Sequence, residues 1–243
     1  MANVFRGINS RLVISTVTFP MDIFLGEKVS TLHRIGKIFK KEKIMVLSKQ
    51  RKKETGAFYT PKIWADFAVK EIMKIFPNIE DFVFYDPCCG EGALLEALPK
   101  GVEKYGTTLE WEDVKICRDK GLQVWQLDFL NDDISDILPS SKMERLIVLT
   151  NPPYVKLPSN DNSFAKINYK TNDVTALFYY RILKELQPIS LFGFNKMDLF
   201  QSPSHKKFRD ETNLYKRTIK ISLVPSKSWN LKGNFPIGFN IIL

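Results

Sequence analysis

Short apolar segments alternate with segments of helical spacing from residue 60 to the last residue of the chain. Apolar or alternating runs predict seven strands, at residues 82–85, 107–109, 122–127, 146–150, 189–194, 218–224 and 235–243. Helical spacing predicts helices at residues 93–98 and 173–186, and another that Thr60 caps with Pro61 in its first turn. We expect the apolar face of that helix in the core, namely Ile63, Trp64, Phe67, Ile72 and Ile75. Strands that alternate with helices are typical of an α/β fold.

Four polar residues stand where predicted strands end. Asp86, Glu110, Asp128 and Asn151 each close or follow one of four consecutive strand-like runs. Because the carboxyl ends of parallel strands meet at one edge of a sheet, we expect these side chains to converge there. Any one of them is an ordinary surface group by itself, but the series indicates a shared site.

The strand at residues 146–150 leads into Asn151, Pro152, Pro153 and Tyr154. An asparagine oxygen and a proline carbonyl can accept both hydrogens of a planar exocyclic amine, and an aromatic ring can stack on the attached base. Prolines donate no hydrogen bond and stiffen the turn, so the acceptors stay aimed. The plain alternative is a strand-ending turn, because proline often terminates strands. The motif indicates an amine site only together with the rest of the sheet edge.

A glycine turn follows the strand at residues 82–85. Residues 86–92 read Asp-Pro-Cys-Cys-Gly-Glu-Gly and lead into the predicted helix at residues 93–98. A strand, a glycine turn and a helix N-terminus form a cofactor cradle in α/β sheets. Gly90 and Gly92 lack the third glycine that a dinucleotide pyrophosphate needs, which argues against a nicotinamide enzyme. Asp86 opens the turn and suits a cationic or hydroxyl-bearing ligand better than phosphates.

Taken in order, these motifs resemble those of the gamma class of AdoMet-dependent DNA methyltransferases, which methylate adenine N6. The resemblance covers residues 53–243, and residues 54–61 look like the N-terminal cofactor motif of that class. It implies a Rossmann-like class I methyltransferase fold, with a mostly parallel seven-stranded sheet and helices on both faces. It also implies S-adenosyl-L-methionine as cofactor, with Glu110 on the ribose and Asp128 with Phe129 at the adenine. The implied cofactor-binding residues are Tyr59, Thr60, Asp86, Cys88, Gly90, Glu110, Asp128 and Phe129.

The same resemblance gives the motif at residues 151–154 a catalytic role. The implied substrate is double-stranded DNA, from which the target adenine must be flipped out before its amine can react. The Asn151 amide and the Pro152 carbonyl would accept the two N6 hydrogens, while Tyr154 and Phe235 would clamp the base. The implied catalytic residues are Asn151, Pro152, Pro153, Tyr154 and Phe235, and the mechanism needs no metal.

Positive charge is concentrated at the start of the chain. The net charge is +9, and residues 1–60 hold 12 basic and 4 acidic residues, or +8 of that total. A basic segment beside the site suits a phosphate backbone. We expect residues 1–50 to be a basic N-terminal extension and residues 51–243 to be the catalytic domain. The seventh predicted strand ends at Leu243, so we expect no C-terminal target-recognition domain and a modification subunit that works with a separate specificity or restriction subunit.

Two further segments carry weaker expectations. Residues 156–172 are polar and predict a mobile loop over the site, and His205 is expected at the surface. The three cysteines match neither a disulfide framework nor zinc-site spacing, which favours the cytoplasm. The chain holds no uninterrupted run of 18 apolar residues, so no membrane span is predicted.

Other functions stay open at this point. The motif at residues 151–154 also fits a methyltransferase that acts on a protein glutamine or on RNA adenine, because these groups present the same planar amine. Cytosine N4 is a further possible target for the same reason. A different class of function is a truncated, non-catalytic remnant or a DNA-binding subunit that keeps the fold.

Overall fold

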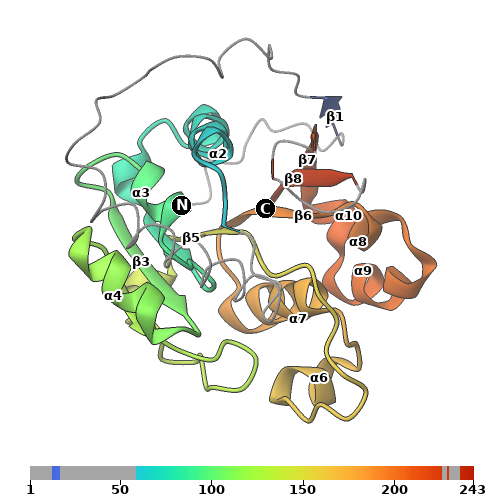
Figure 1. The fold of residues 1–243 in the computed structure, drawn as a ribbon. Helices are drawn as coiled ribbons and strands as arrows, with labels where there is room; N and C mark the ends of the chain where they lie inside the picture. Colours follow the sequence, from blue (N-terminus) through green and yellow to red (C-terminus); the bar gives the residue numbers. More distant parts are fainter. Residues whose placement is uncertain (1–12, 17–58, 226–228, 230–235) are drawn as a thin grey trace, which may run out of the picture.

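A computed structural model describes residues 13–16, 59–225, 229 and 236–243, which build one eight-stranded sheet (Figure 1). The strand order across the sheet is β1-β7-β8-β6-β5-β2-β3-β4. The strands are β1 (Val13–Thr16), β2 (Val83–Asp86), β3 (Glu103–Thr108), β4 (Gln123–Gln126), β5 (Leu146–Thr150), β6 (Ser190–Lys196), β7 (Thr218–Val224) and β8 (Ile237–Ile242). Only β8 runs antiparallel to its neighbours, between β6 and β7.

The sheet confirms the predicted α/β fold with mostly parallel strands. The seven predicted strands correspond to β2 through β8, with ends that shift by a few residues. The additional strand, β1, pairs in parallel with β7, so that Val13 lies opposite Lys220 and Thr16 lies opposite Leu223. This edge strand lies within the predicted N-terminal extension. The proposed division of the chain at residue 50 stays a prediction.

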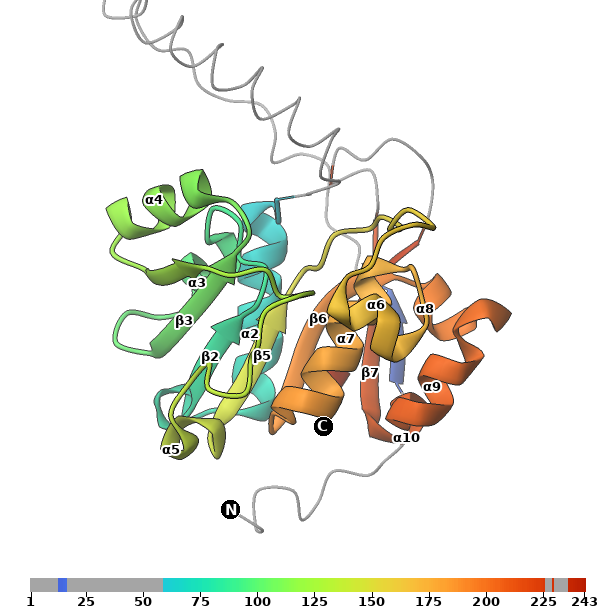
Figure 2. The same cartoon turned by 90° about the horizontal axis from the view of Figure 1, so that it is seen from below.

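Helices cover both faces of the sheet, as predicted (Figures 1 and 2). One face carries α2 (Lys62–Ile75), α3 (Ala93–Ala97) and α4 (Trp111–Asp119). The other carries α7 (Val174–Arg181), α8 (Asp198–Gln201), α9 (Lys206–Thr212) and α10 (Leu214–Arg217). A π-helical turn, η3 (Ile182–Leu186), continues α7. Successive strand side chains point to opposite faces of the sheet and so pack in two separate hydrophobic cores. In β2, Phe84 packs in the core under α2, whereas its neighbours Val83 and Tyr85 pack in the core under α7.

Helix α2 packs with its predicted apolar face against the sheet. Trp64 and Phe67 are buried, and Phe67 makes an edge-to-face contact with Phe239 of β8 at 5.4 Å between ring centroids. The expected cap was wrong: the helix begins at Lys62 after Pro61, without a side-chain cap. The Thr60 hydroxyl instead accepts a hydrogen bond from the Asn151 amide at 3.1 Å. A tertiary partner therefore takes the hydroxyl that the local pattern assigned to the helix.

Residues 156–172 contain a helix that the sequence did not predict, α6 (Phe164–Tyr169). The Lys166 ammonium donates to three backbone carbonyls of the preceding turn, those of Pro158, Ser159 and Asp161, at 2.7 to 2.8 Å. These bonds hold the turn together from within, since they satisfy carbonyls that no helix or strand uses. The polar composition predicted a loop because it gives no sign of this arrangement.

His205 is buried, which corrects its expected place at the surface. It closes the 3₁₀ turn η4 (Pro203–His205), which Ser202 caps by accepting from the Ser204 amide. The turn directs the imidazole inward, towards Asp173 at the start of α7. Two short helices, η2 (Ile79–Asp81) and α5 (Ser140–Met143), complete the described elements. Within the described part of the chain, no helix is long and apolar enough to span a bilayer.

Candidate functional site

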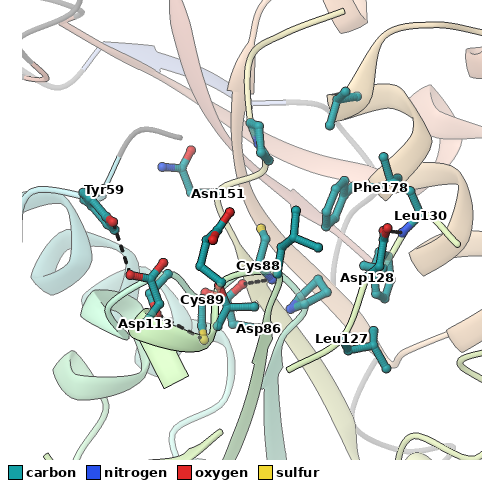
Figure 3. A pocket seen from close by; sticks show the side chains of 18 of the residues that line it. Tyr59, Asp86, Cys88, Cys89, Asp113, Leu127, Asp128, Leu130, Asn151 and Phe178 are labelled. Atoms are coloured by element: carbon teal, nitrogen blue, oxygen red, sulfur yellow. Dashed lines mark hydrogen bonds between the residues drawn. The ribbon is translucent and has the colours of Figure 1, made fainter. Parts of the chain in front are cut away.

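A cavity of about 290 Å³ opens at the carboxyl ends of the central strands (Figure 3). All eight residues predicted to bind a cofactor line it, together with Asn151 and Pro153. Pro152 and Tyr154 lie beside it and do not line it, and Phe235 falls outside the described residues. The structure thus brings the strand-end residues together, as the parallel sheet predicts. The roles assigned to them stay predictions.

Asp86 ends β2 at the floor of the cavity and is almost fully buried. Its Oδ1 accepts hydrogen bonds from the Cys88 amide at 3.1 Å and from the Thr150 hydroxyl at 3.0 Å. Burial disfavours the charged form and raises the pKa of Asp86 from 3.8 to about 7, although both hydrogen bonds act in the opposite direction. A cationic ligand group at this carboxylate would restore the ionised form.

The glycine turn after β2 has a backbone conformation at Gly90 that a residue with a side chain would rarely adopt. Gly90 has a φ of +49°, and a Cβ there would lie 3.0 Å from a ring carbon of Tyr59. The Tyr59 hydroxyl reaches across the turn and donates to Asp113 Oδ1 at 3.3 Å. Two segments that are distant in sequence therefore close one wall of the cavity around Gly90.

The opposite wall is mostly apolar. Phe129 is buried and stacks on Phe178 of α7, with ring centroids 4.9 Å apart and an interplanar angle of 21°. In Figure 3, Leu127, Leu130 and Phe178 gather beside Asp128, away from Asn151. The Asp128 carboxylate accepts from the Leu130 amide at 3.0 Å and is thereby fixed at the rim. A flat ring fits between such apolar walls, and carboxylates at the rim suit hydroxyl or amine donors.

Asn151 stands at the end of β5 with its amide held from both sides. Its Nδ2 donates to Thr60 Oγ1 at 3.1 Å, and its Oδ1 accepts from the Tyr154 hydroxyl at 2.7 Å. Tyr154 is only 6% exposed. The turn itself is tied to the next helix, because Thr175 Oγ1 donates to the Pro153 carbonyl at 2.9 Å. The amide orientation is therefore fixed before any ligand binds.

The cavity also contains residues that the sequence reasoning missed. Asp113 is the clearest example, because it lies in the first turn of α4, only three residues after Glu110. Its position at a helix start beside the strand edge is a signal that could have found it. The other missed lining residues are Pro87, Cys89, Ala93, Leu94, Thr108, Leu109, Leu127, Leu130, Val155, Leu157 and Val174, and they are mostly apolar. Pro87 and Cys89 belong to the motif at residues 86–92, but nothing in the sequence was a reason to assign either a role. The apolar lining residues have no chemical feature that distinguishes them from core residues in the sequence.

Comparison with known proteins gives a family and several relatives. The model of the family described as N-6 DNA Methylase matches residues 30–188. The Type II methyltransferase M.VspI from Vibrio sp. (strain 343) is 32% identical over 63% of this chain and 40% of its own length. The Modification methylase CviBIII from Paramecium bursaria Chlorella virus NC1A is 29% identical over 61% of this chain and 39% of its own length. The chain thus spans about two fifths of each of these relatives.

Solved structures share the fold at low sequence identity. A methyltransferase subunit of a type I restriction-modification system from Streptococcus thermophilus aligns with a TM-score of 0.60 and 18% identity, over 76% of this chain and 44% of its own. A modification subunit of a putative type I restriction enzyme from Vibrio vulnificus YJ016 aligns with a TM-score of 0.56 and 15% identity, over 89% and 50%. At such identities the likeness concerns the fold alone.

Proposed function

Because the chain belongs to the N-6 DNA methylase family and has its Rossmann-like class I methyltransferase fold, we propose that it methylates N6 of adenine in double-stranded DNA. The methyl donor in this proposal is S-adenosyl-L-methionine. The observation that carries the proposal is the shared cavity of Asp86, Glu110, Asp128 and Asn151. One cavity offers sites both for a cationic nucleoside cofactor and for a planar amine.

The residues of the cavity fit this cofactor chemically. The Asp86 carboxyl is buried, which raises its pKa to about 7, and its ionised form suits the cationic α-amino group at the methionine end of the cofactor. Glu110, beside the N-terminus of α4, suits the ribose hydroxyls, and the slot beside Asp128 and Phe178 suits the adenine. When bound, the cofactor supplies an electrophilic methyl group on its sulfonium. The cavity closes around Gly90, which keeps the ligand close to backbone.

The chain's own contribution is to orient the amine. The lone pair of adenine N6 is delocalised into the ring, so the free amine is a poor nucleophile. Asn151 Oδ1 and the Pro152 carbonyl would accept its two hydrogens and localise that lone pair on the nitrogen. An amide oxygen has two lone pairs, so Oδ1 can keep its bond from Tyr154 while it accepts a second hydrogen. Alignment and acceptors placed where positive charge grows then supply most of the rate.

A base inside a duplex cannot reach this cavity, so the target adenine must leave the stack. We infer that the chain acts as a modification component of a restriction-modification system in the cytoplasm, with sequence reading shared with a separate specificity or restriction subunit. The names of the two relatives, a Type II methyltransferase and a modification methylase, support the modification role. The family match also favours DNA over protein glutamine or RNA adenine as the substrate.

Asn151→Ala tests the proposal, because it removes the amine acceptor and leaves the carboxylates of the cavity in place. We expect transfer of labelled methyl groups to double-stranded DNA to fall by a factor of about 100 or more, as for other preorganised acceptors. Cofactor affinity by calorimetry should stay within about threefold of wild type, or ~0.7 kcal/mol.

Asn168→Ala is the matched control, since its exposed side chain bonds only to a carbonyl within α6. Wild-type transfer by the Asn151 variant would contradict the proposed mechanism. Label that enters protein or RNA in place of DNA would assign a different substrate.

A further inference from the structure

Three potential metal ligands converge outside the cavity described above. Asp173 precedes α7, Asp198 begins α8 and His205 closes the turn before α9. One ligand atom from each lies within 4.8 Å of the other two. Figures 1 and 2 show α7, α8 and α9 on the same side of the sheet. They come from three separate elements, so only the tertiary fold brings them together.

The His205 side chain is largely buried but lines a pocket, so its imidazole is accessible to a ligand there. Its side chain is 8% exposed, and its ring nitrogens make no hydrogen bond to any described residue. The nearest charged atom is Asp173 Oδ2, which lies 3.9 Å from Nε2. That distance exceeds a hydrogen bond. Two ligands that each lie ~2.1 Å from one shared ion can be up to ~4.2 Å apart, so the spacing suits a shared ion better than a direct bond.

Both carboxylates have capacity for an ion. Asp173 uses Oδ1 to cap α7, accepting from the Ala176 amide at 3.0 Å, which leaves Oδ2 directed at His205. Asp198 is exposed, and its carboxylate forms no ion pair or hydrogen bond with a described residue. As an exposed side chain it can rotate to bring its oxygen closer to the other two ligand atoms, all three of which already lie within 4.8 Å of one another. Each of the three groups can therefore contribute one ligand without giving up an existing bond.

We propose that Asp173, Asp198 and His205 bind one divalent transition-metal ion. An imidazole with two carboxylates is a nitrogen and oxygen donor set that suits zinc, manganese, cobalt or iron(II). Asp173 and His205 also line a second pocket, of about 530 Å³, which gives water or an anion room to complete the coordination sphere. Lys156 and Lys170 line this pocket too, and their charges favour an anionic ligand there.

The ion would connect the segment that follows Tyr154 to α8. Asp173 forms a β-bridge with Lys156, and the Val174 amide donates to the Val155 carbonyl at 3.0 Å. Asp198 lies just beyond the carboxyl end of β6, where Lys196 donates to the Tyr154 carbonyl at 3.1 Å. Binding should therefore stabilise the wall next to the amine site. It is a structural role, separate from methyl transfer.

Titration with Co²⁺ tests the site, because its visible absorption reports coordination geometry without any assay of activity. The tag-free full chain, stripped by a chelator, should bind one Co²⁺ per chain, and Zn²⁺ should displace it. His205→Gln and Asp198→Asn should each weaken binding by about tenfold or more, since each removes a ligand. Asp198 is exposed, so the Asp198→Asn variant should fold normally. It therefore tests the metal site even if the change at the buried His205 lowers stability.

Two variants serve as controls. Asp210→Asn removes an exposed carboxylate of α9 that pairs with Lys206, and His33→Ala removes the only other histidine of the chain. Both should bind Co²⁺ like wild type. No binding by the folded wild-type chain would overturn the proposal, as would unchanged binding by both ligand variants. A thiolate charge-transfer band would assign the ion to the cysteines and would overturn it equally.

Discussion

At the scale of single residues, the burial of Asp86 makes folding stability depend on pH. In the unfolded chain this carboxyl ionises at its ordinary pKa of 3.8, whereas in the folded protein the pKa is about 7. Between these values the folded state holds a proton that the unfolded state has lost. The free energy of unfolding therefore falls as pH rises from about 4 to about 7. Above pH 7 it stays at this lower value, because Asp86 is then ionised in both states.

Asp86→Asn should remove this dependence, because the amide oxygen can still accept from Cys88 and Thr150 and does not titrate. We expect the variant to be more stable than wild type at pH 8, by at most ~4 kcal/mol. The difference should shrink towards pH 4. Urea unfolding at several pH values measures it, and a difference that is equal at all pH values would contradict the cause.

The same titration should govern cofactor affinity. A cationic ligand group binds the ionised carboxylate, and below the pKa of about 7 Asp86 must lose a proton before it can bind. The dissociation constant for S-adenosyl-L-methionine should therefore rise by about tenfold for each pH unit below 7. Calorimetry at several pH values tests this, with Asp86→Asn as the control that should bind weakly and with little pH dependence. A flat profile for the wild-type chain would show that Asp86 does not meet the cation.

At the scale of elements, Arg181 fixes the segment after β4 to α7. It is 1% exposed and donates to the carbonyls of Phe129 at 2.6 Å and Asp132 at 2.9 Å, while it also forms an ion pair with Glu185. The guanidinium lies over the Phe129 ring at 5.4 Å. One buried cation thus supports the apolar wall of the cavity from behind.

Arg181→Met should leave the buried Phe129 carbonyl and the partly buried Asp132 carbonyl without this donor, and should lower the unfolding free energy by about 3 kcal/mol or more. Cofactor affinity should fall with it, because Phe129 loses its support. Glu185→Gln is the matched control, since it removes only the partly exposed partner and keeps both carbonyl bonds. Denaturant unfolding compares them. Equal decreases for the two variants would place the energy in the ion pair instead of the carbonyl hydrogen bonds.

The elements also show what the sequence could and could not predict. The continuous apolar run of the buried strand β5, and the apolar residues that alternate with polar ones in β7, predicted both strands with the bounds that the structure gives them. Helix α6 was not, because its stability comes from distant partners: the Ala165 amide donates to the Leu130 carbonyl and the Phe164 amide to Asn131. Such contacts with distant residues cannot be predicted from the composition of the segment itself.

The site shows the same division. The sequence predicted Asp86, Glu110, Asp128 and Asn151 together, because strand ends in a parallel sheet share one edge. It did not predict that the Tyr154 hydroxyl would bond to Asn151, or that Thr60 would hold the other end of the same amide. Those contacts depend on side-chain directions and on α2, which a motif of consecutive residues does not specify.

At the scale of the whole molecule, charge is divided unevenly along the chain. The total is +9 and residues 1–60 carry +8, so residues 61–243 carry +1 in all. Four lysines of the described part are paired on their own helices, among them Lys62 with Asp66 and Lys206 with Asp210. The excess charge available to a polyanion therefore belongs to the N-terminal quarter of the chain.

DNA affinity should consequently depend on salt through that segment. The triple variant Arg51→Gln, Lys52→Gln, Lys53→Gln removes three positive charges and should weaken binding to every DNA sequence alike. The slope of log affinity against log salt should become shallower by ~0.9 for each phosphate that the variant no longer neutralises, or up to ~3 in total. Fluorescence anisotropy over a range of salt concentrations measures it.

The matched control neutralises three lysines that pair with acidic residues on their own helices, Lys62, Lys206 and Lys207. It removes the same charge from the molecule but should change the slope much less, because those lysines already have partners. Equal changes in both variants would mean that DNA responds to net charge alone. A change confined to the first variant would assign phosphate binding to the basic segment at residues 51–53.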